Sequence, residues 1–357
     1  MKKSLIALAV LAAAGTASAQ SSVTLFGIVD ATVQRVNNSN GTSVTRLTNS
    51  GYNSSRLGFR GTEDLGGGMS AIFWLEAGMS NDDGQGAGTN ANNQATGAGA
   101  AVAGRQGLTF NRRSTVSLAG NWGEVRLGRD YTPQFWNLTV FDPFGTNGAG
   151  TTQTLNSIIT GSTAVRASNS VGYFLPGNLG GFYGQYQHYF GENISGTPND
   201  GTGDGLRLGW ANGPINVALG VSQTNNTIAG VSAKIKQNNV GGQWDFGVAQ
   251  VLGQYSWDSV GSTDGRGGLI GALFPIGAGQ IRLAYSEYKV KLGASPKSAK
   301  WALGYVHNLS KRTALYVTFA DVKNSNGAAA SAVPGAATGP GINAKSDAWD
   351  LGVRHSF

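Results

Sequence analysis

The chain has 357 residues, a formal net charge of +7 and no cysteine, which excludes a disulfide framework and any cysteine-based metal or thiolate site. It contains 56 glycines, and only 13% of its residues are charged, a composition that few soluble globular domains share. No segment approaches the ~18 consecutive apolar residues of a membrane-spanning helix. Two classes remain open: a β-rich secreted domain, and a closed outer-membrane barrel whose strands alternate between apolar and polar side chains.

The first residues have the features of a secretory signal peptide. A basic start, Met1–Lys3, precedes an apolar run from Leu5 to Ala14, and Ala17–Ala19 forms a small-residue cleavage site. The apolar run has about ten residues, whereas a membrane-spanning helix needs roughly twenty. We therefore expect residues 1–19 to be removed on export and the mature domain to cover residues 20–357.

Beyond residue 20 the dominant pattern is a period of two, as expected when side chains point alternately to the two faces of a strand. The helical period of 3.6 residues is not sustained, so little helix is expected. The pattern predicts sixteen strands, at Val23–Arg35, Ser55–Gly61, Met69–Ser80, Phe110–Ala119, Trp122–Asp130, Arg166–Leu175, Phe182–Phe190, Gly205–Ala211, Ile215–Gln223, Lys234–Trp244, Val248–Trp257, Gly268–Phe274, Gln280–Val290, Ser298–His307, Thr313–Val322 and Asp347–Phe357.

The connections between these segments alternate in length. Short turns rich in Gly, Pro, Asn and Asp, such as PGNLGG at 176–181 and NGP at 212–214, interleave with longer stretches, of which Tyr131–Val165 is the longest. The connections are therefore short at one end of the sheet, the short-turn end, and long at the other, the elaborated end. Both termini lie at the short-turn end. Outer-membrane barrels sort their connections in this way, into short periplasmic turns and long extracellular loops, whereas a secreted sandwich has no reason to do so.

In such a barrel the apolar side chains face lipid and the opposite parity lines a wet interior. Sixteen strands leave room for a channel, and a positive wall in a narrow passage attracts small anions. Arginines outnumber acids on the inward parity, whose main polar members are Arg56, Arg60, Glu76, Arg126, Arg166, Arg207, Gln254, Arg282, Lys300, Asp350 and Arg354. Arg112 has no clear parity, and for any single arginine a solvated position without a role in selectivity is an equally good interpretation.

Five separated stretches also carry a family resemblance: SSVTLFGIVDA, SSRLGFRGTEDLGGGMSAIFWLEAG, GEVRLGRDYTPQFW, LSKRT and the terminal Phe357. Together they resemble the trimeric general-diffusion porins of the Gram-negative outer membrane, in the branch typical of β-proteobacteria. The resemblance implies an all-β fold, a sixteen-stranded antiparallel transmembrane β-barrel whose third long loop, here Tyr131–Val165, folds into the pore. It also implies a homotrimer among outer-membrane lipids, delivered by periplasmic chaperones and the barrel-insertion machinery.

The same resemblance points to the residues of the pore constriction. Members of this branch place arginines on the wall opposite the third loop. Matched by motif, these are Arg56 and Arg60 in SRLGFRG, Arg112 in FNRR and Arg166 in VRASNSVGYF, with Arg126 as a fifth candidate. The resemblance thus predicts a positively charged funnel with a preference for anions.

Four further residues complete the predicted site. Glu76 is an acidic residue of the lumen, and Asp142 in VFDPFG is an acidic loop residue near the opening. The last strand, which contains Trp349 and ends at Phe357, should pair with Val23–Arg35 and close the barrel, because a closed sheet leaves no edge. By the resemblance, the terminal Phe357 is also the mark that the insertion machinery reads.

Two alternatives stay open. An outer-membrane surface enzyme such as a lipid hydrolase would need a serine beside a histidine, and only His188, His307 and His355 are available, without a G-x-S-x-G stretch. A secreted β-rich binding protein would not explain the sorted loops. The preferred prediction is a passive, anion-selective outer-membrane pore for small anionic or neutral solutes, with no catalysis, no metal, no cofactor and no nucleic-acid partner.

Overall fold

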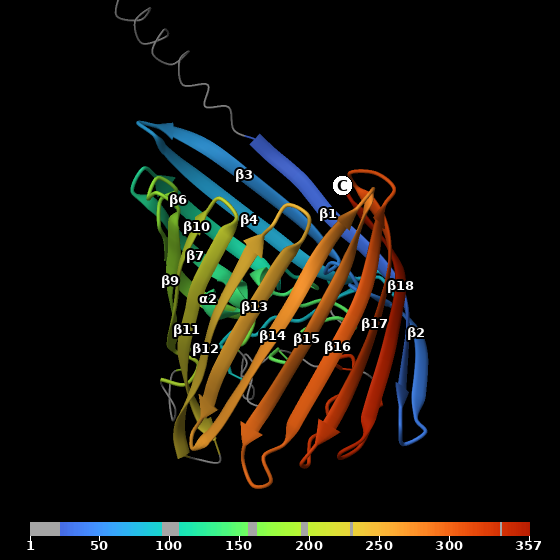
Figure 1. Ribbon diagram of the computed structural model, residues 1–357. Coiled ribbons are helices and arrows are strands. Elements are labelled where there is room, and N and C mark those ends of the chain that lie inside the picture. Colours follow the sequence, from blue (N-terminus) through green and yellow to red (C-terminus); the bar gives the residue numbers. More distant parts are fainter. Residues whose placement is uncertain (1–21, 95–106, 156–162, 194–198, 229–230, 336–337) are drawn as a thin grey trace, which may run out of the picture.

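The computed structural model describes residues 22–94, 107–155, 163–193, 199–228, 231–335 and 338–357. The predicted signal peptide, residues 1–19, lies outside these ranges. In the part of the chain that is described, sixteen long strands form one closed antiparallel sheet (Figure 1), as predicted. These strands are β1 (Ser22–Asn38), β3 (Arg56–Gly66), β4 (Met69–Ser80), β6 (Arg113–Gly120), β7 (Gly123–Tyr131), β8 (Arg166–Phe174), β9 (Phe182–Tyr189), β10 (Gly203–Asn212), β11 (Ile215–Ile228), β12 (Val231–Asp245), β13 (Gln250–Val260), β14 (Thr263–Ile276), β15 (Gly279–Lys291), β16 (Lys297–Asn308), β17 (Thr313–Ser325) and β18 (Lys345–Ser356).

Two short strands were not predicted. The strand β2 (Ser43–Asn49) pairs with the far half of β1, and β5 (Gln85–Gly86) pairs with the end of β4. Both lie in connections that the sequence marks as long loops. They fold back on the barrel strands at the elaborated end, so they extend the wall without adding a barrel strand.

The barrel closes between its first and last strands. β1 and β18 pair in antiparallel register from Ile28 opposite Ser356 to Asn38 opposite Ser346, which includes Arg35 opposite Trp349. The predicted seam is therefore confirmed. In Figure 1 the start of β1 and the end of β18 lie together at the top, at the short-turn end.

The two parities of the strands have opposite chemistry. Outward side chains are apolar and exposed, for example Leu208 at 48% and Leu303 at 45% exposure, as the sequence pattern predicts. Inward positions hold buried polar groups such as Asp350 and Lys300, at 0% and 2% exposure. Because charged groups of this kind are tolerated only away from hydrocarbon, the strands present one face to lipid and the other to a polar lumen.

The described part of the third long connection, residues 131–155 and 163–165, lies inside the barrel, as predicted. It follows Tyr131 and contains the short helix α2 (Pro133–Val140), which begins with proline at a first-turn position (Figure 1). Phe135 and Leu138 of this helix are buried against the inner wall. Of the helices in the described ranges, none is long and apolar enough to cross a membrane.

Candidate pore constriction

The helix α2 is fixed to the wall of β10, β11 and β12 by Asn137. The side-chain nitrogen Nδ2 of Asn137 donates to the Ala218 carbonyl oxygen at 3.0 Å and to Asn239 Oδ1 at 2.8 Å. The side-chain oxygen Oδ1 of Asn137 accepts from Arg207 Nε at 3.0 Å. Asn239 in turn donates to the Gln134 carbonyl oxygen at 3.0 Å. Since Asn137 is fully buried, this network fixes the start of the loop in one position.

Glycines make room for the loop along the inner wall. A Cβ atom on Gly241 of β12 would lie 2.2 Å from the Phe141 ring, and one on Gly271 of β14 would lie 2.4 Å from Pro143. Positions on β10, β11 and β16 are similarly crowded, where a Cβ would come within 3.0 Å of Pro133, Gln134 and Phe144. We call Gly205, Gly220, Gly241, Gly271 and Gly304 the glycine track; at these five positions a side chain would occupy the volume that the loop fills.

The second half of the loop is held by polar contacts from other strands. The Ala149 amide donates to Asp350 Oδ2 at 2.7 Å, and Lys300 Nζ donates to the carbonyl oxygens of Thr151 and Ala332, both at 2.9 Å. Lys300 thereby joins the third loop to the connection before β18. The loop is thus fixed to the β10–β18 side of the barrel, and the β3–β8 side faces the remaining lumen.

Three of the predicted arginines meet on that opposite side. Arg56 Nη1 and Arg112 Nε both contact Glu76 Oε1, at 3.2 Å and 2.6 Å. Arg112 and Arg166 both donate to the Tyr131 hydroxyl, at 2.6 Å and 2.9 Å. We call these five residues the arginine cluster: Arg56, Glu76, Arg112, Tyr131 and Arg166. Four of them lie on the strands β3, β4, β7 and β8, and Arg112 directly precedes β6. Only one of its members is acidic.

The other two predicted arginines lie apart from the cluster. Arg60 has no partner in it, and its guanidinium carbon lies 5.3 Å and 5.1 Å from the ring centroids of Phe26 and Trp74. Arg126 contacts two carboxylates, Glu124 at 2.8 Å and Asp130 at 2.6 Å, so most of its charge is balanced locally. The sequence motifs placed all five arginines on the lumen wall. They could not tell which arginines meet in the cluster and which lie outside it.

Asp142 belongs to the third loop, and the structure gives the orientation of its side chain, which the sequence left open. The side chain is 4% exposed and accepts hydrogen bonds from the backbone amides of Phe144, Thr146 and Thr152 at 2.9–3.2 Å. Burial raises the pKa of this carboxyl, and the three backbone donors oppose that shift. Asp142 therefore shapes the loop and does not present an exposed charge at the opening. It is also the only charged residue in the sequence from 132 to 165.

Aromatic rings hold the lumenal arginines, a feature that sequence reasoning missed. Guanidinium carbons lie 3.8–6.0 Å from ring centroids for Arg60, Arg112, Arg113, Arg126, Arg166, Arg207, Arg282 and Arg354. The rings include Phe26 and Trp74, which lie on inward positions and pack edge to face at 5.1 Å. A ring orients a guanidinium without cancelling its charge, unlike a carboxylate.

Arg113 and Tyr131 are site residues that the sequence prediction also missed. Arg113 Nε lies 3.5 Å from Asp130 Oδ2, and the guanidinium lies over Trp74 at 4.5 Å. The doubled arginine in FNRR was the available signal for Arg113, because the second arginine lies beside the first at the start of a strand. Tyr131 had only its position at the root of the third loop to mark it.

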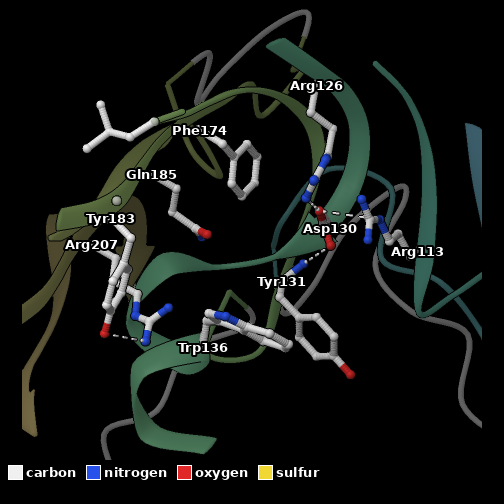
Figure 2. Close-up of a pocket in the computed structure, with 11 residues that line it drawn as sticks. Arg113, Arg126, Asp130, Tyr131, Trp136, Phe174, Tyr183, Gln185 and Arg207 are labelled. Carbon is white, nitrogen blue, oxygen red and sulfur yellow. Dashed lines mark hydrogen bonds and ion pairs between the residues drawn. The ribbon is translucent and has the colours of Figure 1, made fainter. Parts of the chain in front are cut away.

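A pocket of about 320 Å³ adjoins the cluster on the short-turn side of α2 (Figure 2). Its lining includes Arg113, Arg126 and Arg207, together with the rings of Trp136 and Phe174. It lies inside the barrel, between the helix and strands β6 to β10. The lumen at this level is therefore both cationic and aromatic.

The histidines lie elsewhere. His188 Nδ1 lies 2.9 Å from Asp204 Oδ1, while His307 and His355 contact Tyr305 and Thr313 at 3.3 Å and 2.9 Å. None of these partners is a serine. Within the described ranges no group of three His, Asp or Glu side chains could hold a metal ion.

Known proteins share this architecture. A family model described as Gram-negative porin matches residues 5–327. Outer membrane porin protein 32 of Delftia acidovorans is 40% identical over 372 residues, with 100% of both chains covered. An outer membrane porin of Bordetella pertussis is 30% identical, again with 100% of both chains covered.

Solved structures agree with these matches. An anion-selective porin from Comamonas acidovorans superposes with a TM-score of 0.82 at 36% identity, covering 94% of this chain and 100% of that one. The trimer form of OmpT from Vibrio cholerae shares the fold alone, with a TM-score of 0.61 at 13% identity, covering 94% and 99% of the two chains. The full-length sequence matches and the closed sixteen-stranded barrel with its inward loop lead to one conclusion: the chain belongs to the Gram-negative porin family.

Proposed function

We propose that the chain forms a passive, anion-selective diffusion channel for small hydrophilic solutes in the Gram-negative outer membrane. One observation carries the proposal: Arg56 and Arg112 share a single acid, Glu76, and Arg166 meets Arg112 at the Tyr131 hydroxyl. These arginines face a loop whose only charged residue, Asp142, is buried. A solute that passes between loop and wall meets positive charge on one side and no opposing acid on the other.

The local charge balance supports anion preference. Around the passage, Arg56, Arg112, Arg113, Arg126 and Arg166 face Glu76, Glu124 and Asp130, which leaves an excess of positive charge. Excess charge of one sign in a narrow passage with low-dielectric walls raises the local concentration of counter-ions. Chloride and small organic anions should therefore enter more readily than cations of the same size.

The contacts that hold the arginines in place leave their charge available to attract anions. Arg166 lies 4.4 Å over the Tyr131 ring and donates to the hydroxyl of the same residue. Such contacts restrict the guanidinium while leaving its charge to act on a passing solute. We assign Arg60 and Arg126 to the part of the lumen between the cluster and the short-turn end, where they attract anions more weakly. We assign the channel no catalytic step.

The assembly and biogenesis follow from the same proposal. The known trimer form of OmpT shares the fold, and we propose a homotrimer for this chain as well. The exposed apolar outer wall suits contact with outer-membrane lipids. Phe357 pairs with Gly27 through two backbone hydrogen bonds, at 3.1 Å and 3.2 Å, so we propose that the seam strand with Trp349 and Phe357 is the segment that periplasmic chaperones and the insertion machinery handle.

Single-channel recording in a planar bilayer tests the proposal. We expect stepwise openings without a voltage or ligand trigger, and a reversal potential in a KCl gradient that lies toward the chloride equilibrium potential. A reversal potential on the potassium side would reject anion selectivity and leave the fold intact. The absence of channel events from correctly folded trimers would reject the channel itself.

A further inference from the structure

The pocket beside α2 has a feature that a simple ion passage does not need, which is an exposed tryptophan. Trp136 is 40% exposed although its neighbours Phe135 and Leu138 on the same helix are buried. It lines the pocket together with Phe174 and Tyr183, so apolar rings border a wet lumen on several sides. Keeping a large apolar ring in water is unfavourable, and such a surface gains free energy when a flat apolar group covers it.

A second feature of the pocket is an uncompensated cation. Arg207 is 6% exposed, and no ion pair involves it within the described ranges. Its contacts are neutral: Nε donates to Asn137 Oδ1 at 3.0 Å and Nη2 to the Tyr183 hydroxyl at 3.3 Å. A buried guanidinium without a carboxylate is unfavourable by itself and favours an anion as its missing partner.

The other arginines of the pocket differ in this respect. Arg126 and Arg113 share Asp130 at 2.6 Å and 3.5 Å, so a local acid already balances them in part. Arg126 also lies only 3.8 Å from the Phe174 ring centroid and covers one face of that ring. Figure 2 shows Arg207 beside Trp136, with Gln185 and Phe174 across the pocket. The free cation and the exposed ring are therefore neighbours.

We propose that this pocket is a solute subsite for monocyclic aromatic carboxylates. The carboxylate accepts hydrogen bonds from the Arg207 guanidinium, and the ring lies against Trp136 with the edge of Phe174 opposite. A cavity of about 320 Å³ accommodates one such molecule with water. The inference rests on the proposed channel function, because the solute reaches the pocket through the pore.

The chemistry predicts which anions the subsite prefers. A benzoate ring is flat and stacks on an indole, whereas the ring of cyclohexanecarboxylate has the same charge and similar size but is puckered. Aromatic stacking adds roughly 0.5–1.5 kcal/mol beyond area burial. We therefore expect benzoate to bind up to about tenfold more tightly than cyclohexanecarboxylate, and acetate to bind more weakly than both.

Block of chloride current measures this preference. Benzoate, cyclohexanecarboxylate or acetate is added to the bath facing the short-turn end, and the fall in single-channel chloride conductance is titrated. The variants are Trp136→Leu and Arg207→Gln, with Trp244→Leu as a matched control because Trp244 is 47% exposed on the outer wall. Trp136→Leu should remove the preference for benzoate, Arg207→Gln should weaken block by every carboxylate, and Trp244→Leu should behave like the parent chain.

The outcomes separate the two proposals. Equal block by benzoate and cyclohexanecarboxylate in the parent chain, or a benzoate preference that survives Trp136→Leu, would overturn the subsite. Because Arg207 also contacts Asn137, its variant perturbs α2 as well as the subsite. The Trp136 ring packs 5.4 Å from the Tyr131 ring, so Trp136→Leu is judged by the ratio of benzoate block to cyclohexanecarboxylate block, which a general change at the cluster alters for both anions alike. Chloride conductance and reversal potential without added carboxylate, recorded in the same bilayers, report on the channel proposal independently.

Discussion

Arg112 and Arg166 donate to one acceptor, the hydroxyl of Tyr131, at 2.6 Å and 2.9 Å. Two like charges are thereby held next to each other by a neutral group, which keeps both available to a passing anion. Tyr131 is the last residue of β7 and stacks at 5.2 Å on Phe135 of α2. The same side chain therefore links the arginines of the wall to the root of the loop that faces them.

Tyr131→Phe should disturb the order of the cluster without changing its charge. The variant keeps the ring under Arg166 but removes the acceptor shared by two guanidiniums, so both should fluctuate more. We expect increased open-channel current noise with an unchanged sign of selectivity. Tyr173→Phe is the matched control, since its hydroxyl donates to the Trp122 carbonyl oxygen on the outer wall at 2.6 Å. Equal noise in the two variants would contradict the assigned role of Tyr131.

Arg166→Gln should weaken anion preference. In water, one unit charge about 7 Å from an ion contributes about 0.6 kcal/mol, or about a threefold change in local concentration. The ratio of chloride to potassium permeability, obtained from reversal potentials in a KCl gradient, should fall by a factor of this order. Arg266→Gln, which removes an exposed cation on the outward face of β14, should leave the ratio unchanged. A parallel fall in both variants would show that total charge matters and position does not.

Glu76→Gln should act in the opposite direction. The side chain of Glu76 is 5% exposed and contacts both Arg56 and Arg112, so its neutralisation leaves two guanidiniums without their acid. Chloride preference should rise, while loss of the charged hydrogen bonds should cost about 1–3 kcal/mol of stability. Reversal potentials and the thermal midpoint of the folded barrel measure the two effects. A variant that is less anion-selective than the parent would refute the charge balance proposed for the cluster.

The sequence was informative where one rule governs many residues. Lipid on one side and water on the other impose the period of two, so all sixteen barrel strands were predicted, and β4 has the predicted bounds. Strand ends were predicted less well. β11 continues five residues beyond Gln223, through TNNTI, because a strand that extends past the lipid loses its apolar parity while its backbone pairing with β12 continues.

The site was predictable in kind but not in detail. Parity places arginines in the lumen, but which of them meet depends on contacts between distant strands, such as Glu76 with Arg56 and Arg112. The burial of Asp142 depends on the path of the loop backbone, and no local pattern encodes that path. The exposed ring of Trp136 is equally invisible, since an apolar residue on a short helix is more often buried.

Lys300→Met should loosen the second half of the third loop. Lys300 is 2% exposed, and its ammonium group donates to the carbonyl oxygens of Thr151 and Ala332. The substitution removes both hydrogen bonds and leaves two buried carbonyl oxygens without this donor, which should lower the free energy of unfolding by about 1–3 kcal/mol. We expect a lower thermal midpoint and more frequent brief closures of the channel. Lys297→Met is the control, because that lysine pairs with Glu287 at an exposed site, where an ion pair contributes under about 1 kcal/mol. Identical behaviour of the two variants would exclude Lys300 as a loop anchor.

Gly241→Ala tests whether the glycine track seats the loop. A Cβ at this position would lie 2.2 Å from the ring of Phe141, which is completely buried, so the ring and the loop that carries it have to give way. The loop must therefore shift away from β12 and toward the arginine wall, which narrows the passage. We expect lower single-channel conductance with little change in reversal potential, because no charge is altered.

The neighbouring strand offers a matched control for this variant. Gly253 of β13 has the Leu269 carbonyl oxygen at 3.5 Å as the nearest atom to a new Cβ, an ordinary contact distance. Gly253→Ala should therefore conduct like the parent chain. If Gly241→Ala also conducts normally, the loop tolerates displacement from its seat and the track does not set the width of the pore. If both variants lose conductance, a general cost of replacing strand glycines explains the effect and the seat does not.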